Sequence, residues 1–240
     1  MKPTFFSLLI AASNSVLPCA AQTQLMGDMN GDGRLTIDDV TLLVKAVMEY
    51  DSATDELDNG GKTYVDLGLT SGTLWATCNI GANTPEDYGH YFAWGETQTK
   101  TRYYPANYKY KGNSTGTLSL ADDAAHVQWG GSWRMPTTAE ISELYRECDW
   151  EWTSRGTSSG YVVKSRVRQT SIFLPAAGIS TIDEVQGVND RGIYWTNCIS
   201  TDDANKAICL DFTANRFDVS SSDNYEGASI RPVLSAKISR

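Results

Sequence analysis

The chain has 240 residues, of which 41% are apolar and 20% are charged, and its formal net charge is −9 at pH 7. This composition supports a substantial hydrophobic core and excludes a chain that is disordered throughout. The acidic balance, with no run of Lys and Arg, excludes a nucleic-acid partner, because phosphate binding requires clustered positive charge.

Residues 1–21 resemble a secretory signal peptide. Lys2 precedes a moderately apolar run over residues 5–17, and small residues follow it. The run is too short and too polar to anchor the chain in a membrane. We therefore predict cleavage near Ala21 and export to the medium or the cell surface. Cys19 leaves lipidation open as an alternative, although Pro18 fits a lipidation motif poorly.

Export would place the remaining cysteines in an oxidising compartment, where disulfides are permitted. They are Cys78, Cys148, Cys198 and Cys209, and they allow three pairings. Cys198 and Cys209 flank a polar turn between two predicted strands, so a cross-strand disulfide is one interpretation. Four buried free thiols are the other, since cysteine is often buried without a partner.

Residues 28–39, with the sequence DMNGDGRLTIDD, have the spacing of a calcium-binding loop. Oxygen ligands stand at positions 1, 3, 5, 7, 9 and 12, and Gly33 at position 6 allows the sharp turn. The predicted calcium ligands are Asp28, Asn30, Asp32, Arg34 through its carbonyl, Thr36 and Asp39. The alternative is a turn that caps the next helix without a metal.

A helix is predicted over residues 37–50, because apolar residues recur at helical spacing. Its apolar stripe consists of Val40, Leu43, Val44, Val47 and Met48. The loop and helix, over residues 27–49, resemble one calcium-binding repeat of a dockerin domain. Dockerins pair two such repeats, and this sequence has one. The stripe is therefore predicted to pack on the following domain or on another chain, as in a homo-oligomer or a surface assembly.

The predicted domain organisation is a signal peptide (1–21), a calcium loop and helix (22–50), a polar linker (51–62) and a folded domain (63–240). Short aromatic and β-branched segments in this last part predict strands. These cover residues 64–67, 73–78, 91–95, 161–167, 171–178, 192–196, 207–212, 216–219 and 228–233. Helices are predicted over 119–128 and 137–148, the second starting at a capping box of Thr137 and Glu140. Strands without βαβ alternation indicate an α+β fold with antiparallel sheet.

Seven motifs give this part a family resemblance. They lie at residues 65–69, 74–81, 91–97, 129–137, 171–178, 192–195 and 229–233. Over residues 63–234 the chain resembles the Fibrobacter succinogenes major paralogous domain. Such domains are similar to C-type-lectin-like domains. The resemblance implies a compact scaffold whose C-terminal strands and loops carry the binding surface.

Polar residues crowd between the apolar residues of segment 196–225, which is where the resemblance places the binding surface. The predicted ligand-binding residues are Asn197, Thr201, Asp202, Asp203, Asn205, Asn215, Asp218, Ser221, Asp223, Asn224 and Tyr225. Some relatives have this segment rewritten by diversity-generating retroelements, and its composition resembles such targets. Ordinary polar loops are the alternative. The polar segment 97–116 adds four tyrosines as candidate contacts, Tyr103, Tyr104, Tyr108 and Tyr110.

The sequence favours binding over catalysis. Its two histidines, His90 and His126, are isolated, and it has no nucleophile motif and no zinc-ligand spacing. Aromatic side chains can stack on sugars or anchor protein interfaces. We therefore predict a non-enzymatic module that binds a glycan or protein ligand. The alternatives are a structural subunit of a surface assembly and an accessory of carbohydrate degradation.

Overall fold

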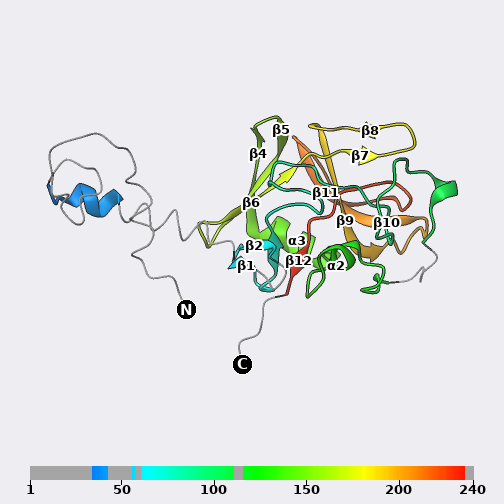
Figure 1. Cartoon of the computed structure of the whole chain (residues 1–240), viewed down its shortest axis with the longest axis horizontal. Coiled ribbons are helices and arrows are strands. Elements are labelled where there is room, and N and C mark those ends of the chain that lie inside the picture. Colours follow the sequence, from blue (N-terminus) through cyan, green and yellow to red (C-terminus); the bar gives the residue numbers. More distant parts are fainter. Residues whose placement is uncertain (1–33, 43–55, 58–60, 111–115, 236–240) are drawn as a thin grey trace, which may run out of the picture. The chain divides into compact units, whose positions relative to one another are not determined.

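The computed structural model describes residues 34–42, 56–57, 61–110 and 116–235, coloured by position in Figure 1. The chain divides into two units, Met1–Asp51 and Ser52–Arg240. The predicted signal peptide and most of the calcium loop lie outside the described residues. No helix in the described part of the chain combines the length and apolar character needed to span a bilayer.

In the first unit, residues 37–42 are helical, and Thr36 caps this helix. The Asp38 amide donates to Thr36 Oγ1 (3.2 Å), and the Thr36 amide donates to Asp39 Oδ2 (2.8 Å). These two bonds satisfy amides that a helix start leaves without partners. Of the predicted apolar stripe, only Val40 lies within the described residues; Leu43, Val44, Val47 and Met48 lie outside them.

Among its described residues, the second unit has two α-helices, α2 (Ala124–Trp129) and α3 (Thr138–Glu147), and a short 3-10 helix at Pro105–Asn107. Its strands are β1 (Glu56–Leu57), β2 (Thr63–Asp66), β3 (Leu74–Ala76), β4 (Cys148–Arg155), β5 (Ser158–Ser165), β6 (Ser171–Pro175), β7 (Ile179–Ser180), β8 (Val185–Gln186), β9 (Arg191–Ile199), β10 (Lys206–Thr213), β11 (Arg216–Asp223) and β12 (Val233–Leu234).

These strands form four small sheets, in the orders β1-β2-β3-β12, β11-β10-β9, β4-β5-β6 and β7-β8. Every neighbouring pair within them is antiparallel. The prediction of a mixed α+β fold with antiparallel sheet is therefore confirmed. In the first sheet, β12 pairs with β3 through Val233 and Trp75, so the two ends of the unit meet.

Several predicted boundaries differ from the structure. The expected linker 51–62 contains β1, and α2 begins at Ala124 because Asp123 caps it by accepting from the His126 amide. Segment 91–95 contributes only an isolated bridge from Phe92 to Ala228. Strand β4 was not predicted. Its alternation of Trp150 and Trp152 with acidic residues is a period-2 signal that could have revealed it.

The sheet β11-β10-β9 separates two hydrophobic cores. Leu210 and Phe212 of β10 belong to one core, while Ala207 and Cys209 belong to the other. The adjacent strand β9 shows the same division, because Tyr194 belongs to the first core and Trp195 to the second. Strand side chains alternate between faces, so β9 and β10, which are buried on both faces, form a rigid central layer, and β11 is its partly exposed edge strand.

Five tryptophans stand inside the seven sequence motifs, which predicts that they belong to the core: Trp75, Trp94, Trp129, Trp133 and Trp195. The prediction is confirmed for four of them. Trp75, Trp94, Trp133 and Trp195 are at most 1% exposed. Trp129 is only partly buried, and its ring packs edge-on against Trp133 at a centroid distance of 5.0 Å. The core prediction is therefore wrong for Trp129, which covers the core from outside.

All four described cysteines are free thiols. Cys209 lies opposite Trp195 in the β9–β10 ladder and is not paired with Cys198, so the cross-strand disulfide interpretation is wrong. Cys148 and Cys209 are buried, and Cys78 and Cys198 are partly so. Burial raises the pKa of the Cys209 thiol to about 12, which keeps it protonated and unreactive.

The guanidinium of Arg231 is buried at the junction of three segments, with 1% of the residue exposed. Its Nη1 donates to the carbonyls of Ala76 (3.1 Å) and Thr77 (3.0 Å). Its Nε donates to Asn79 Oδ1 (2.9 Å), and Nη2 donates to the Phe173 carbonyl (2.8 Å). This fork of donors joins the end of β3 and strand β6 to the segment before β12.

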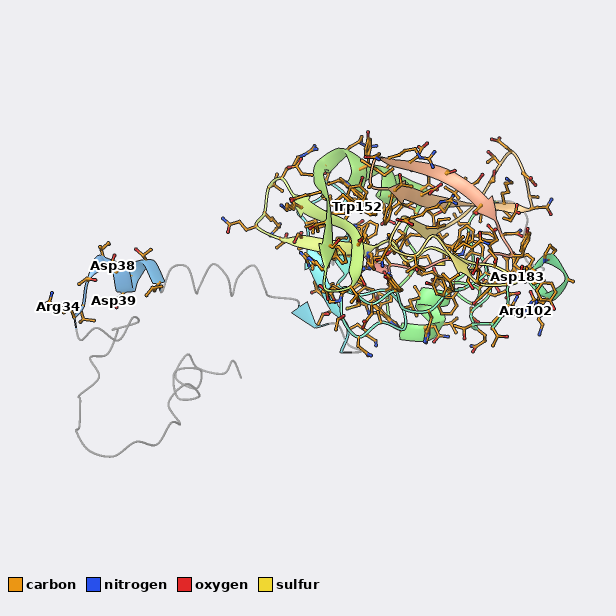
Figure 2. All side chains as sticks on the ribbon, turned by 90° about the horizontal axis from the view of Figure 1, so that it is seen from above. Arg34, Asp38, Asp39, Arg102, Trp152 and Asp183 are labelled. Atoms are coloured by element: carbon orange, nitrogen blue, oxygen red, sulfur yellow. The ribbon has the colours of Figure 1, made fainter. Side chains whose placement is uncertain are left out.

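Arg231→Met should lower the free energy of unfolding by about 3 kcal/mol or more, because four acceptors lose their donor in a buried site. Urea unfolding followed by tryptophan fluorescence measures the change. Arg102→Met is the matched control: Arg102 and its partner Asp183 lie at the surface (Figure 2), with side chains 60% and 79% exposed. Its expected cost is about 0–1 kcal/mol. Equal losses in the two variants would contradict the role given to Arg231.

Candidate functional site

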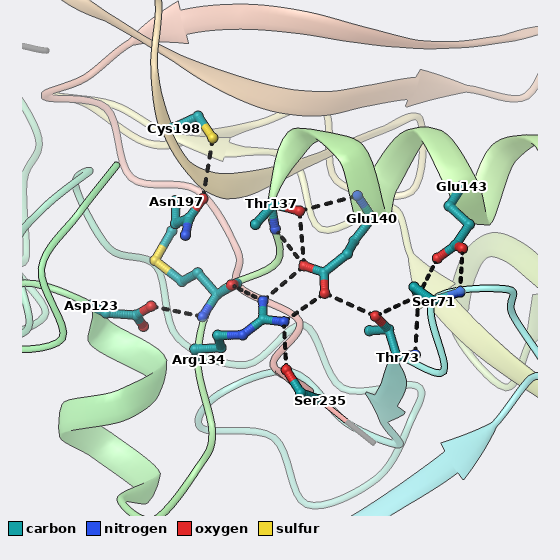
Figure 3. A network of polar contacts seen from close by, with 11 residues as sticks. Ser71, Thr73, Asp123, Arg134, Thr137, Glu140, Glu143, Asn197, Cys198 and Ser235 are labelled. Atoms are coloured by element: carbon teal, nitrogen blue, oxygen red, sulfur yellow. Dashed lines mark hydrogen bonds and ion pairs between the residues drawn. The ribbon is translucent and has the colours of Figure 1, made fainter. Parts of the chain in front are cut away.

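The glycine- and tryptophan-rich stretch at residues 129–145 is built as framework. Thr137 caps α3: the Glu140 amide donates to Thr137 Oγ1 (3.2 Å), and the Thr137 amide donates to Glu140 Oε2 (2.8 Å). The predicted capping box is therefore confirmed. Arg134 forms a fork with the same carboxylate, at 2.8 Å and 2.6 Å (Figure 3). Arg134 is thus an internal donor.

Two carboxylates of α3 extend this network to distant parts of the chain (Figure 3). Thr73 donates to Glu140 Oε1 (2.9 Å), and both the amide and the hydroxyl of Ser71 donate to Glu143. Arg134 Nη2 also donates to Ser235 Oγ (3.2 Å). The network ties the loop before β3 to α3 and to the segment after β12. Both Glu140 and Glu143 are therefore structural.

The surroundings of Glu140 favour its anionic form. Burial alone raises the pKa of this carboxyl, but the Arg134 hydrogen bond, the Thr137 amide and the Arg134 charge outweigh it and lower the pKa to about 2. Glu140 is therefore ionised at neutral pH and is a poor proton donor.

The structure gathers most of the predicted ligand-binding residues at one end of the sheet β11-β10-β9. In the register, Lys206 lies opposite Asp223 and Ala207 opposite both Ser222 and Ile199, so the end of β9, the β9–β10 loop and the end of β11 meet. We call residues 196–205 and 221–225 the polar end. It contains Asn197, Thr201, Asp202, Asp203, Asn205, Ser221, Asp223, Asn224 and Tyr225.

Two predicted residues do not lie there. Asn215 is in the β10–β11 turn at the opposite end of the sheet, and Asp218 faces Asp211 midway along the ladder. Within the polar end, Asn224 is buried, its amide donating to the Asn205 carbonyl (2.9 Å) and its side chain to Ala204. Thr201, Asp202 and Asn205 are exposed. The side chains open to a ligand are therefore mainly those of the β9–β10 loop.

The tyrosines of segment 97–116 divide into structural and accessible members; residues 111–115 of this segment lie outside the described residues. Tyr103 is 2% exposed, so the prediction that it contacts a ligand is wrong. The hydroxyl of Tyr108 donates to the Trp94 carbonyl (2.8 Å). Tyr104 and Tyr110 are half-buried, and Tyr110 packs edge-on against Trp94 at a centroid distance of 5.4 Å.

Tyr110 lines an open cleft of about 590 Å³, which we call the Tyr110 cleft. Its lining residues are Gly95, Glu96, Thr97, Gln98, Thr99, Lys100, Lys109, Tyr110, Ala121 and Asp122. Backbone hydrogen bonds link segments next to the cleft with the polar end. The amide of Trp94, which precedes the lining residue Gly95, donates to the Asn224 carbonyl, and the Leu118 amide donates to the Asn197 carbonyl, each at 2.9 Å. Segments far apart in sequence therefore share one backbone framework.

The cleft walls are held by an ion pair between Lys100 and Glu96. Lys100 Nζ also donates to the Asn107 carbonyl (2.8 Å), and the Lys109 amide donates to Glu96 Oε1 (2.5 Å). Segments 96–100 and 107–109 are thereby fixed to each other. In the sequence, the spacing of four between Glu96 and Lys100 is a weak signal for this pair.

The predicted calcium loop is described only in its second half. Arg34 and Asp39 appear at the start of the helical segment in Figure 2, and the Asp39 residue is 3% exposed. Its Oδ2 accepts from the Thr36 amide, so this carboxylate takes part in the cap of the helix. Asp28, Asn30 and Asp32 lie outside the described residues, and among the described ones no group of three or more His, Cys, Asp or Glu gathers to hold a metal.

Comparison of the chain with protein-family models, with curated proteins and with solved structures found no match. The geometry of the polar end and the Tyr110 cleft is therefore the basis on which function is argued.

The Glu140 network predicts a pH-dependent stability. In the folded protein the pKa of Glu140 is about 2, below its reference value of 4.5. The ionised carboxylate therefore stabilises the fold fully above pH 4.5, and this stabilisation is lost as the pH falls towards 2. Glu140→Gln should cost about 3 kcal/mol at pH 7 and much less near pH 2. Denaturant unfolding across this range measures the difference.

The control is Glu151→Gln, in an exposed pair with Lys164, which should leave stability nearly unchanged. A Glu140→Gln deficit that is constant with pH would contradict the assignment.

Proposed function

We propose that this chain is an exported, non-catalytic binding module of C-type-lectin-like fold that recognises a glycan or protein ligand. The observation that carries the proposal is the junction of the polar end with the Tyr110 cleft. Exposed loop side chains and a cleft of about 590 Å³ share one backbone framework there. This volume is within the range of small-molecule sites.

The scaffold supports recognition by loops. The β9–β10 loop joins two strands that are buried on both faces, so its ends are held in fixed positions. Thr201, Asp202 and Asn205 are exposed on this loop. Variable polar loops on a rigid layer are a common basis for binding. We propose that residues 201–205 are the part best suited to diversification, because their side chains contribute least to the core.

Catalysis is less well supported, because the titratable side chains have structural partners. Glu140 and Glu143 are bound within the framework network, and Glu96 is paired with Lys100. The ring of His126 lies 3.3 Å from the Trp133 carbonyl oxygen, and that of His90 packs over Gly81, where a Cβ would clash with it. These contacts explain the residues as parts of the fold.

A structural subunit of a surface assembly is the second candidate. In the first unit, Ile37 is 73% exposed and Val40 is 51% exposed. Exposed apolar side chains along one helix favour contact with a further protein surface. In this case the first unit would mediate assembly, and a ligand site in the second unit would not be required.

Ligand recognition is tested with the full secreted chain on glycan and peptide arrays. Combined substitution of Thr201→Ala, Asp202→Ala and Asn205→Ala should reduce binding about tenfold or more, because polar contacts on the exposed loop are removed. Asn215→Ala, at the opposite end of the same sheet, is the matched control and should bind normally. Absence of any ligand on both arrays, together with oligomers in light scattering, would overturn the proposal and favour the assembly role.

Calcium binding is tested by isothermal titration of the full chain with CaCl₂. Asp32→Ala should abolish binding, because a carboxylate at position 5 is lost. Asp38→Asn, at position 11 of the loop, is the control and should retain it. Saturation at about 100 times Kd should stabilise the first unit by about 2.7 kcal/mol, reversed by EDTA. Equal affinities of the two variants would contradict a metal site in this loop.

A further inference from the structure

We infer that the Tyr110 cleft binds a short, neutral carbohydrate, with one sugar ring over Tyr110 and without a metal ion. The inference rests on the proposed binding function and names the ligand class and the residues that recognise it. It follows from three properties of the cleft: a fixed aromatic ring, neutralised walls and a lining rich in hydroxyl and amide groups.

The aromatic ring is fixed by its neighbours. Tyr110 packs edge-on against the buried Trp94, with an interplanar angle of 89°. Gly95 makes this position available, because a Cβ there would lie 2.6 Å from Tyr110 Cγ. Gly95 also has φ +75°, a conformation that side-chain-bearing residues rarely adopt. A ring held in one orientation offers contact area to a flat apolar face at little entropic cost.

The charges of the cleft largely cancel. Lys100 and Glu96 form an ion pair whose side chains are only 15% and 10% exposed. The remaining ionic groups of the lining are one cation, Lys109, and one anion, Asp122. A cleft without an excess of either sign selects neither an anionic nor a cationic ligand. A neutral ligand suits it better.

The rest of the lining offers both donors and acceptors. Thr97, Gln98 and Thr99 supply hydroxyl and amide groups, and the Thr97 carbonyl is fixed by a bond from Gln128 Nε2 (2.7 Å). Groups of this kind match a ligand whose hydroxyls both donate and accept hydrogen bonds. Sugars combine such hydroxyls with a flat apolar face that can cover an aromatic ring.

A peptide fits the cleft less well. Extended peptides are bound by exposed sheet edges or by apolar pockets for their side chains. The cleft walls are residues 95–100 and 109–110, which lie outside the strands, and Tyr110 is the one large apolar surface in the lining. A volume of about 590 Å³ and an open shape suit a short oligosaccharide lying along the surface.

The test uses isothermal titration of the full chain with cellotriose, maltotriose, xylotriose and the anionic trigalacturonate, each with and without EDTA. At least one neutral trisaccharide should bind, and EDTA should not change its affinity.

Tyr110→Ala should weaken binding about tenfold or more, while Tyr110→Phe should retain it within about threefold. Gly95→Ala should also weaken binding, because the ring is displaced. Tyr145→Ala, at a half-exposed tyrosine of α3, is the matched control and should bind normally.

The outcomes separate this inference from the proposed function. Binding that survives Tyr110→Ala but is lost in the triple variant of the β9–β10 loop would place the ligand at the polar end, overturning the cleft assignment alone. Binding of trigalacturonate only, or binding abolished by EDTA, would overturn the neutral, metal-independent ligand. Absence of binding to all four sugars would overturn the inference, and a peptide hit on the arrays would then preserve the proposed function.

Discussion

The fold depends on the buried positive charge of Arg231, whose hydrogen-bond acceptors among the described residues are all neutral oxygens. The guanidinium of Arg231 is satisfied by three carbonyls and the side-chain oxygen of Asn79. Burial lowers the pKa of this group, and the cost of removing it from water is offset only if every donor finds an acceptor. Since the acceptors come from segments about 60 to 155 residues away in sequence, the charge requires one tertiary arrangement.

The carboxylate of Glu140 is a second charged group that joins distant segments, and its charge is negative where that of Arg231 is positive. This carboxylate is held by Arg134, Thr137 and Thr73, so helix α3 is fixed to the start and the end of the second unit. Both junctions lie in the framework. The β9–β10 loop and the Tyr110 cleft have exposed polar groups instead. The exposed loops are thus separate from the buried polar groups that join distant parts of the fold.

Local signals in the sequence predicted much of this framework. The capping box at Thr137, the antiparallel α+β architecture and the burial of Trp75, Trp94, Trp133 and Trp195 all follow from short-range patterns. The elements that were predicted wrongly also have local causes. Helix α3 ends at Glu147 and the chain passes directly into β4, with no glycine or proline to mark the change. Isolated bridges, as at Phe92, leave almost no periodic pattern.

The sequence by itself determined which residues could cap, alternate or fill a core, because these properties depend on neighbours a few positions apart. Only the tertiary structure decided which polar residues share a surface. The ladder register brought the end of β11 to the β9–β10 loop and carried Asn215 to the far end. The bonds from Trp94 to Asn224 and from Leu118 to Asn197 set the Tyr110 cleft beside them. The same packing buried Tyr103, because a side chain's burial is set by long-range contacts that composition does not encode.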